Sequence, residues 1–294
     1  MKYLFRFFLF IICVTILAVG FFFLRANNRL QPVLSDEIPP VRKQREAEVL
    51  SAFFGLDNAL PIAAIGLSWK APGKDGMPVV FSHEIDTETL DASDFKIETA
   101  KGNLLGVEVV TLRPAVEAFE LRTVLLIGEF GNHPDDEPIE VAIVDDLRTR
   151  SGQNFKGQKV NVTPLEKGPF LSYAEYFKLD DNYPYVANGR GCDCPTEKTK
   201  MVVRTVWAGG VRALNGEELG AKELQNFKIF LQVGSDTLQV NPFQIADLRD
   251  NDNNIDLCLD QEGIPLMVSI EANTAIDPRD DANDFTSLEV VARW

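Results

Sequence analysis

The chain has 294 residues and a formal net charge of −15, with 44 acidic against 29 basic side chains. An excess of acidic groups repels the phosphate backbone of nucleic acids, so we expect no nucleic-acid partner. Apolar residues make up 45% of the chain, which suffices for packed cores, and the length exceeds that of one typical domain. We therefore expect two folded domains with linkers rather than a long disordered chain.

The first feature in chain order is an uncharged run over residues 7–24, preceded by Lys2 and Arg6. As a helix this run would extend roughly 27 Å, close to the roughly 30 Å of the hydrocarbon core of a bilayer. A cleaved signal peptide has a shorter apolar region and a small-residue cleavage site. We expect residues 1–30 to form a single-pass membrane anchor with the body outside the cytoplasm. Cleavage, which would give a secreted or periplasmic protein, is the alternative.

Residues 31–61 are predicted to form a stalk that contains a short helix. The helix is expected over residues 42–54 because several large apolar side chains fall on one helical face. These side chains are Val49, Leu50, Phe53 and Phe54. The stalk would then end in a helix that docks on the first domain.

The region 62–165 changes to short apolar runs separated by turn residues, which favours an antiparallel sandwich. No long amphipathic helix interrupts these runs, and this argues against alternating α/β units. The predicted strands cover residues 64–69, 78–82, 95–98, 106–112, 122–127, 139–144 and 159–163.

A second region, 199–294, repeats this plan. Its predicted strands cover residues 200–207, 227–232, 237–241, 255–259, 266–272 and 287–292. The run 95–97, Phe-Lys-Ile, recurs at 227–229, and the run 138–143 has a similar counterpart at 265–270. Two similarities in the same order, at offsets of 132 and 127 residues, indicate a divergent tandem repeat.

Three motifs of the first region carry further information: VFSHEID at 80–86, TLDASDF at 89–95, and the segment from VDDLR to Gly152 at 144–152. They resemble bacterial immunoglobulin-like domains of the surface-layer type. Those domains have an F-S-x-x-[IV]-D turn, an L-x-x-S-x-F entry to the next strand and a closing hairpin rich in Asp and Gly. Residues 276–283 are similar to that hairpin, so the second copy is divergent. The resemblance implies sandwiches that serve as spacers, adhesin parts or accessory domains of envelope proteins, and it implies no catalytic residues.

The predicted fold class is therefore all-β, with two immunoglobulin-like antiparallel β-sandwich domains after an N-terminal transmembrane helix or signal segment. The first domain is expected at 62–165 and the second at 199–294. An aromatic-rich interdomain segment is expected at 166–198. We expect the aromatic residues of this segment to pack on a domain or to fill the groove between the domains. Binding of carbohydrate or an envelope protein is the functional alternative, with Tyr183 and Tyr185 as candidates.

Residues for catalysis are sparse. The two histidines, His83 and His133, each lie in a predicted surface turn beside acidic residues. Two isolated histidines cannot form a multi-histidine zinc site without several carboxylates, and neither has a companion at helical spacing. The sequence has no phosphate loop, dinucleotide fingerprint, Gly-x-Ser-x-Gly elbow or His-Glu-x-x-His helix. We therefore expect a function other than catalysis. A carboxylate-based envelope hydrolase with its site between the two domains is the alternative.

One acidic loop predicts a metal site. Asp250, Asp252, Asn254 and Asp256 alternate along the chain, and their oxygens are the ligands that calcium prefers. The loop lacks the residues that an EF-hand has at positions six and twelve, so an acidic turn that leads into a strand is the other interpretation. Calcium is the one cofactor that the sequence suggests. A second acidic loop, at 277–284, has the same two interpretations.

The cysteines beyond the anchor are Cys192, Cys194 and Cys258. Side chains alternate along the predicted strand 255–259, so Cys258 lies on the face opposite to the apolar residues. The loop that carries the other two cysteines is long enough to reach this face, and an exported compartment permits disulfides. We expect a disulfide from Cys258 to either Cys192 or Cys194. A three-thiolate metal site is the alternative, but it lacks a fourth ligand.

Together these features predict a membrane-anchored, extracytoplasmic binding or structural module of the cell envelope. Its expected partners are the membrane, through residues 7–24, and an envelope protein or carbohydrate. Besides the envelope enzyme, the sequence leaves open a calcium-stabilised subunit of a surface assembly.

Overall fold

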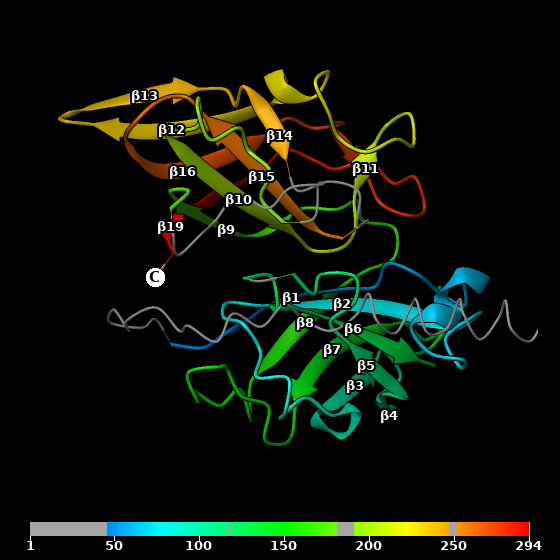
Figure 1. The fold of residues 1–294 in the computed structure, drawn as a ribbon. Helices are drawn as coiled ribbons and strands as arrows, with labels where there is room; N and C mark the ends of the chain where they lie inside the picture. The colour runs from blue at the N-terminus through cyan, green and yellow to red at the C-terminus, as the bar shows by residue number, and fades with distance from the viewer. Residues whose placement is uncertain (1–45, 118, 181–190, 247–251, 294) are drawn as a thin grey trace, which may run out of the picture.

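The structure is a computed structural model that describes residues 46–117, 119–180, 191–246 and 252–293. These residues form β-strands and short 3-10 helices, with no α-helix among them, so the prediction of an all-β chain is confirmed. The strands build two domains that lie one above the other in Figure 1. Within the described residues no helix is long and apolar enough to cross a membrane, and the predicted anchor at 7–24 lies outside them.

The first domain contains one curved sheet in the order β4-β3-β7-β8-β1-β2-β6-β5. Strand β8 connects its two halves because it pairs with β7 on one edge and, in parallel, with β1 on the other. The strands are β1 (Val49–Phe53), β2 (Asp75–Phe81), β3 (Phe95–Thr99), β4 (Leu104–Gly106), β5 (Val109–Thr111), β6 (Thr123–Gly128), β7 (Pro138–Ile143) and β8 (Lys159–Thr163).

The curved sheet encloses one core, to which both of its halves contribute. Along β3, Phe95 and Ile97 are buried while Lys96 between them is exposed, which is the alternation of a strand with one face on a core. Phe81 of β2 packs edge-on against Phe155, with ring centroids 4.8 Å apart. Burial of such a side chain stabilises the fold by about 1.5–3 kcal/mol.

The second domain is built from two main sheets that pack across a core containing Trp207, Leu257, Phe227 and Val268. One sheet has the order β14-β15-β10-β9-β19 and the other β13-β12-β16-β18. The strands are β9 (Leu171–Phe177), β10 (Met201–Trp207), β11 (Arg212–Ala213), β12 (Phe227–Val233), β13 (Asp236–Val240), β14 (Gln244–Ala246), β15 (Asn254–Leu259), β16 (Ile264–Ile270), β17 (Ala275–Ile276), β18 (Thr286–Glu289) and β19 (Val291–Ala292). Strands β11 and β17 form a separate small pair.

The two sequence similarities occupy equivalent places in the two domains. In the first domain β3 follows the 3-10 helix η2 (Ala92–Asp94) and pairs with β7. In the second domain β12 follows the 3-10 helix η3 (Leu224–Asn226) and pairs with β16. The registers also correspond, since Phe95 pairs with Ile143 and Phe227 with Ile270. The recurring sequence therefore encodes one recurring pair of strands.

The predicted helix at 42–54 is wrong over its described part, because residues 49–53 form strand β1. Both faces of this strand are covered. Ala52 lies in the core of the first domain, whereas Leu50 packs with residues of the second domain. A strand buried on both faces is a continuous apolar run, which periodicity alone does not separate from a helix.

Two further segments differ from the prediction. Instead of a strand at 64–69, the chain forms the 3-10 helix η1 (Ile62–Gly66), in which Ala64 is buried and Ile62 is exposed. The aromatic-rich segment 166–198 contains a complete strand, β9, which pairs with β10 inside the second domain. Its aromatic residues Tyr173 and Phe177 are buried there.

Candidate functional site at the domain junction

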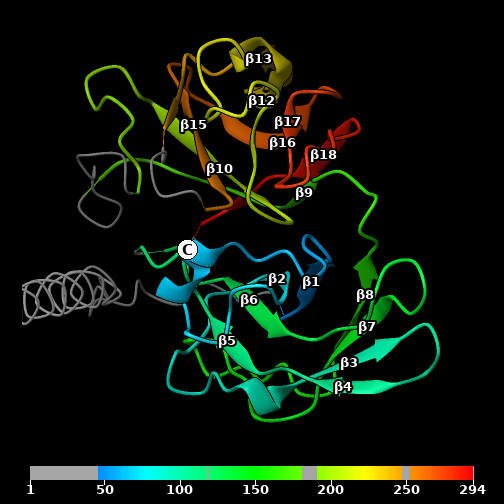
Figure 2. The ribbon, with the colours of Figure 1, turned by 90° about the vertical axis from the view of Figure 1, so that its right-hand side faces the viewer.

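The two domains meet across the outer face of the sheet that contains β9, β10 and β15. Figure 2 shows these strands above β1, β2 and β6 of the first domain. Leu50 and Val80 of the first domain pack there with Tyr173, Val206 and Val291 of the second. A group of buried charged side chains lies at the same junction and is its most unusual feature.

Arg204 is the centre of this group. On β10 it lies directly opposite Asp256 of β15 on one side and Glu175 of β9 on the other. Its Nε and Nη2 atoms donate to the two carboxylate oxygens of Asp256 at 2.7 and 2.8 Å. Its Nη1 lies 2.9 Å from Oε1 of Glu120, which belongs to the first domain. Arg204 is 2% exposed, and both carboxylates are completely buried.

A second buried group lies beside the first. Arg122, which precedes β6, donates to the backbone carbonyl of Ser82 at 2.8 Å and lies 3.4 Å from the carboxylate of Glu175. Its guanidinium also covers the ring of Tyr173, 4.3 Å from the ring centroid. Arg293, after β19, contacts the same glutamate through Nη2. Two arginines from the two domains therefore share one carboxylate.

These contacts fix the ionisation states at the junction. Burial alone raises the pKa of Glu175, but the guanidinium groups of Arg293, Arg122 and Arg204 outweigh it, so the pKa lies below the usual range of a glutamate. Burial raises the pKa of Tyr173, so its hydroxyl stays protonated and donates to Glu175 at 3.3 Å. Glu175 is thus an ion-pair partner, which is a structural role.

His83 lies at the edge of the same junction, and its predicted place in a surface turn is wrong because it is 6% exposed. Its Nδ1 lies 2.8 Å from the hydroxyl of Ser82. Burial and, to a smaller extent, the charge of Arg122 lower the pKa of His83 to about 4. The histidine is therefore neutral near pH 7. The neighbouring acidic residue suggested exposure, but the fold buries the ring.

A cavity of about 150 Å³ adjoins the charged groups. Its wall is mostly apolar and includes Leu56, Leu60 and Leu112 of the first domain and Gly209 of the second. Asp252 lies on this wall, and the carboxylates of Glu117 and Glu120 each have an oxygen within 4.8 Å of a carboxylate oxygen of Asp252 and of each other. Arg204 already neutralises Glu120, and the oxygens of Asp252 accept from the backbone and side chain of Asn254. Asp252, the acid of this group that lines the cavity, is therefore engaged in structural contacts.

The residues of the predicted calcium site take separate places. Asp250 lies outside the described residues, whereas Asp252 and Asn254 bind one another at the start of β15. Both oxygens of Asp256 accept from Arg204. In the second acidic loop, Asp277 accepts from the backbone amides of Arg279 and Asp281, as an Asx turn does. Calcium at either loop stays a prediction.

The remaining predicted site residues concern the aromatic segment and the cysteines. Tyr183 and Tyr185 lie outside the described residues. Cys258 forms a disulfide with Cys194, and Cys192 is a buried free thiol. Cys258 lies on the face of β15 opposite to the domain core, as the alternation of the strand predicts, but the loop with Cys192 and Cys194 covers it completely.

The charged junction was missed at the sequence level. Its signal was a charged residue inside an otherwise apolar strand: Arg204 in the run Met201–Trp207 and Glu175 in Leu171–Phe177. A charge in such a place is expected to be paired. The partners Glu120 and Arg122 lie in loops before β6, and only the fold brings them to the strands.

The chain was compared with known proteins. No protein-family model matches it, and no curated protein does. One solved structure with some similarity is the N-terminal part of the bacterial S-layer protein SbsC, at 11% identity and a TM-score of 0.28. Another comprises domains 1–6 of the surface layer protein SbsC, at 9% identity and a TM-score of 0.28. The matches cover 84% and 85% of this chain but 44% and 55% of the others, so the chain spans about half of their length. Surface-layer protein domains are thus weak structural neighbours of this chain.

Replacement of Arg204 tests the junction. Arg204→Met leaves Glu120 and Asp256 buried without their cation, so we expect a loss of about 3–5 kcal/mol in the free energy of unfolding, measured with urea. Arg148→Met is the matched control. It removes an exposed ion pair with Asp146, 2.8 Å long, and should cost about 1 kcal/mol or less. Equal losses in the two variants would contradict a buried network.

The buried histidine predicts a dependence of stability on pH. His83 has a lower pKa in the folded chain than the ordinary 6.5 of the unfolded chain, so acid favours the unfolded state. Neutral, buried His83 makes its full contribution to the free energy of unfolding above pH 6.5. This contribution falls by about 3 kcal/mol as the pH is lowered towards 4. Asp75 acts in the opposite direction because burial raises its pKa to about 6. The measurement is therefore the difference in unfolding free energy between wild type and His83→Gln at several pH values. A difference that does not change with pH would contradict a buried neutral His83.

Thiol counting tests the disulfide. Labelling of the denatured, unreduced chain should modify two cysteines, Cys13 and Cys192, and only Cys13 in Cys192→Ala. Three labelled thiols in that variant would contradict the bond between Cys194 and Cys258. Replacement of Cys194 and Cys258 by serine should lower the unfolding free energy by about 4 kcal/mol, because the bond closes a loop with a sequence separation of 64.

Proposed function

We propose that this chain is a membrane-anchored, extracytoplasmic module of the cell envelope. In this proposal two immunoglobulin-like β-sandwich domains act as one rigid body that binds or positions other envelope components. The observation that carries the proposal is the buried charge network between the domains, centred on Arg204. A network of this kind suits a part whose task is to keep a fixed shape.

The charged side chains support a rigid arrangement because a partial separation of the domains would remove their ion-pair partners without exposing them fully to water. Glu120 of the first domain and Arg204 of the second are both almost fully buried, and so are Arg122 and Glu175. Breaking one such pair without full hydration of both partners leaves an uncompensated buried charge, which costs about 3–5 kcal/mol. Small rotations of one domain against the other are therefore strongly opposed. A hinged enzyme that opens and closes between its domains would need a more polar and hydrated contact.

Two features support a location outside the cytoplasm. The first is the disulfide between Cys194 and Cys258, which is buried beneath its own loop in the manner of a structural bond. Structural disulfides persist in oxidising compartments and are rare in the cytosol. The second is the uncharged run at 7–24 that precedes the body. The strongly acidic body is well suited to remain soluble beside a membrane with an anionic surface.

The alternative of an envelope hydrolase has less support. Catalysis by paired carboxylates needs one acid that holds a proton and one that is free to act as base or nucleophile. At the junction Glu120, Glu175 and Asp256 are all paired with arginines, and the adjoining cavity is mostly apolar. A calcium-stabilised assembly subunit remains a second proposal, which rests on the acidic loop that contains Asp250.

Fractionation of the full chain, produced in a bacterial host, tests the location. We expect the protein to stay in the membrane after alkaline carbonate extraction, and its body to be digested when protease is added to spheroplasts. A variant without residues 2–26 should remain in the cytoplasm with Cys194 and Cys258 reduced. A soluble periplasmic product that starts at or after Asn27 would support the cleaved alternative, and protection of the body in intact spheroplasts would overturn the proposal.

A further inference from the structure

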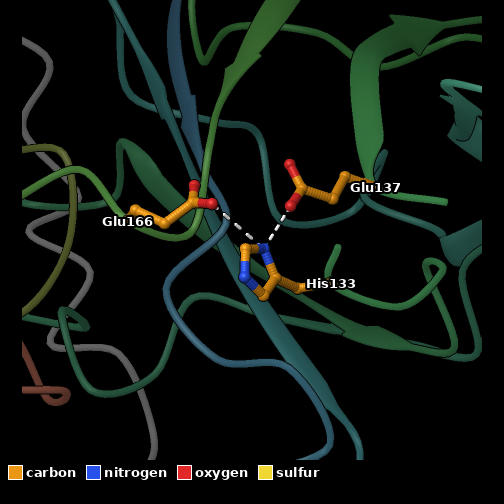
Figure 3. Close-up of side chains that lie close together, drawn as sticks. All are labelled: His133, Glu137 and Glu166. Carbon is orange, nitrogen blue, oxygen red and sulfur yellow. Dashed lines mark hydrogen bonds and ion pairs between the residues drawn. The ribbon is translucent and has the colours of Figure 1, made fainter. Parts of the chain in front are cut away.

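A histidine and two glutamates meet at the surface of the first domain (Figure 3). His133 lies in the turn between β6 and β7, Glu137 immediately precedes β7, and Glu166 follows β8. Nδ1 of His133 contacts Oε1 of Glu137 and lies 3.3 Å from Oε1 of Glu166. In the figure the two carboxylates approach the ring from opposite sides. One donor atom from each of the three residues lies within 4.8 Å of the other two.

The convergence is unusual because both carboxylates approach the same ring nitrogen. Nδ1 of an imidazole carries at most one proton, whether the ring is neutral or charged. That proton can make one good hydrogen bond, so the other carboxylate faces a nitrogen that has nothing further to donate. Two negative groups held this close together favour a divalent cation between the three donor atoms.

The turn that carries His133 is held in place by contacts that do not involve the cluster. Its backbone amide donates to Oδ2 of Asp57 at 2.9 Å. Asn132 and Asp136 exchange two backbone hydrogen bonds, and the carboxylate of Asp136 accepts from the amide of Lys101 at 2.8 Å. Gly131 is required here, because a Cβ atom at this position would lie 2.0 Å from the carbonyl oxygen of Asp136. The histidine is thus positioned before any ion binds.

Glu166 comes from a different part of the chain, the segment between β8 and β9 that connects the two domains. Both ends of this segment are fixed. Leu165 is buried in the core of the first domain, and Gly168 lies so close to Ala282 of the second that a Cβ atom would be 2.0 Å from its carbonyl oxygen. Glu166 lies between these two contacts. An ion at the cluster would therefore fasten the connecting segment to the turn of the first domain.

The donor set selects the class of ion. Zinc binds imidazole nitrogen at about 2.0–2.1 Å and carboxylate oxygen at about 2.0–2.2 Å, in a tetrahedron whose ligand atoms are then roughly 3.3 Å apart. The separation of Nδ1 from Glu166 equals this value, and a rotation of the partly exposed Glu137 side chain brings the third donor into place. Calcium and magnesium prefer oxygen ligands alone, so an imidazole disfavours them. The fourth position would be left to water.

We propose that His133, Glu137 and Glu166 form a binding site for a zinc-like divalent transition metal, which clamps the interdomain segment to the first domain. The three side chains are partly exposed, so an ion reaches them without a change in the fold. This inference does not depend on the location or anchoring of the protein.

Titration of the full chain with zinc chloride, after removal of metal with a chelator and in detergent, tests this site. The protein carries Cys13→Ser so that the anchor thiol does not compete, and Cys192 is buried. We expect one equivalent of zinc to bind and to raise the melting temperature. His133→Asn and Glu166→Gln should each raise the dissociation constant for zinc at least tenfold. Mutation of the residues that merely hold metal ligands in place already lowers metal affinity by about 10–100-fold.

Two variants serve as matched controls. His83→Gln removes the other, buried histidine and should bind zinc like the wild type. Glu140→Gln removes a carboxylate on β7 that pairs with Lys159 and should also leave binding unchanged. Calcium chloride at the same concentration should not shift the melting temperature through this site. Absence of zinc binding in the parent protein, or an affinity of His133→Asn and Glu166→Gln equal to that of the parent, would overturn the proposal and leave His133 as the partner of an ion pair.

Discussion

The buried position of Arg204 is the constraint on which the arrangement of the two domains depends. Its guanidinium group contacts Asp256 from its own sheet and Glu120 from the other domain, and water reaches none of the three. A guanidinium with one carboxylate would satisfy the charge, but not all of its donors. The first domain supplies the second acceptor. The face of the sheet that carries Arg204 is therefore fully buried only when the first domain covers it. The position of Glu120 defines how the first domain is placed.

One strand shows how the sequence combines this constraint with folding. Along β15, Leu257 points into the core of the second domain, whereas Asp256 and Cys258 on either side point to the opposite face. Asp256 accepts from Arg204, and Cys258 bonds to Cys194 in the loop that covers this face. The alternation that forms the core thus also builds the junction and its cover. A shift of register by one residue would exchange leucine for aspartate, so the register is strongly specified.

How much could be predicted from the sequence depended on whether the information was local. The alternation of Phe95 and Ile97, and its recurrence at Phe227, identified strands that the structure places in equivalent pairs. The strand Val49–Phe53 was missed because both of its faces are buried, and this erases the alternation. The meeting of Glu120 with Arg204, and of Glu166 with His133, joins distant parts of the chain. No spacing rule reports such contacts, since they exist only once the chain has folded.

The chemistry of the junction also bears on why it is charged at all. Replacement of a buried ion pair by well-packed apolar residues is often neutral or stabilising, so the network is weak evidence for high stability. The planar guanidinium has a fixed donor geometry, so the two-sided contact of Arg204 and the shared carboxylate of Glu175 are satisfied in one orientation of the domains. We interpret the charges as a device that fixes the angle between the domains. A fixed angle between the domains holds the two ends of the molecule at a defined distance and direction from each other, which suits a part that positions other components.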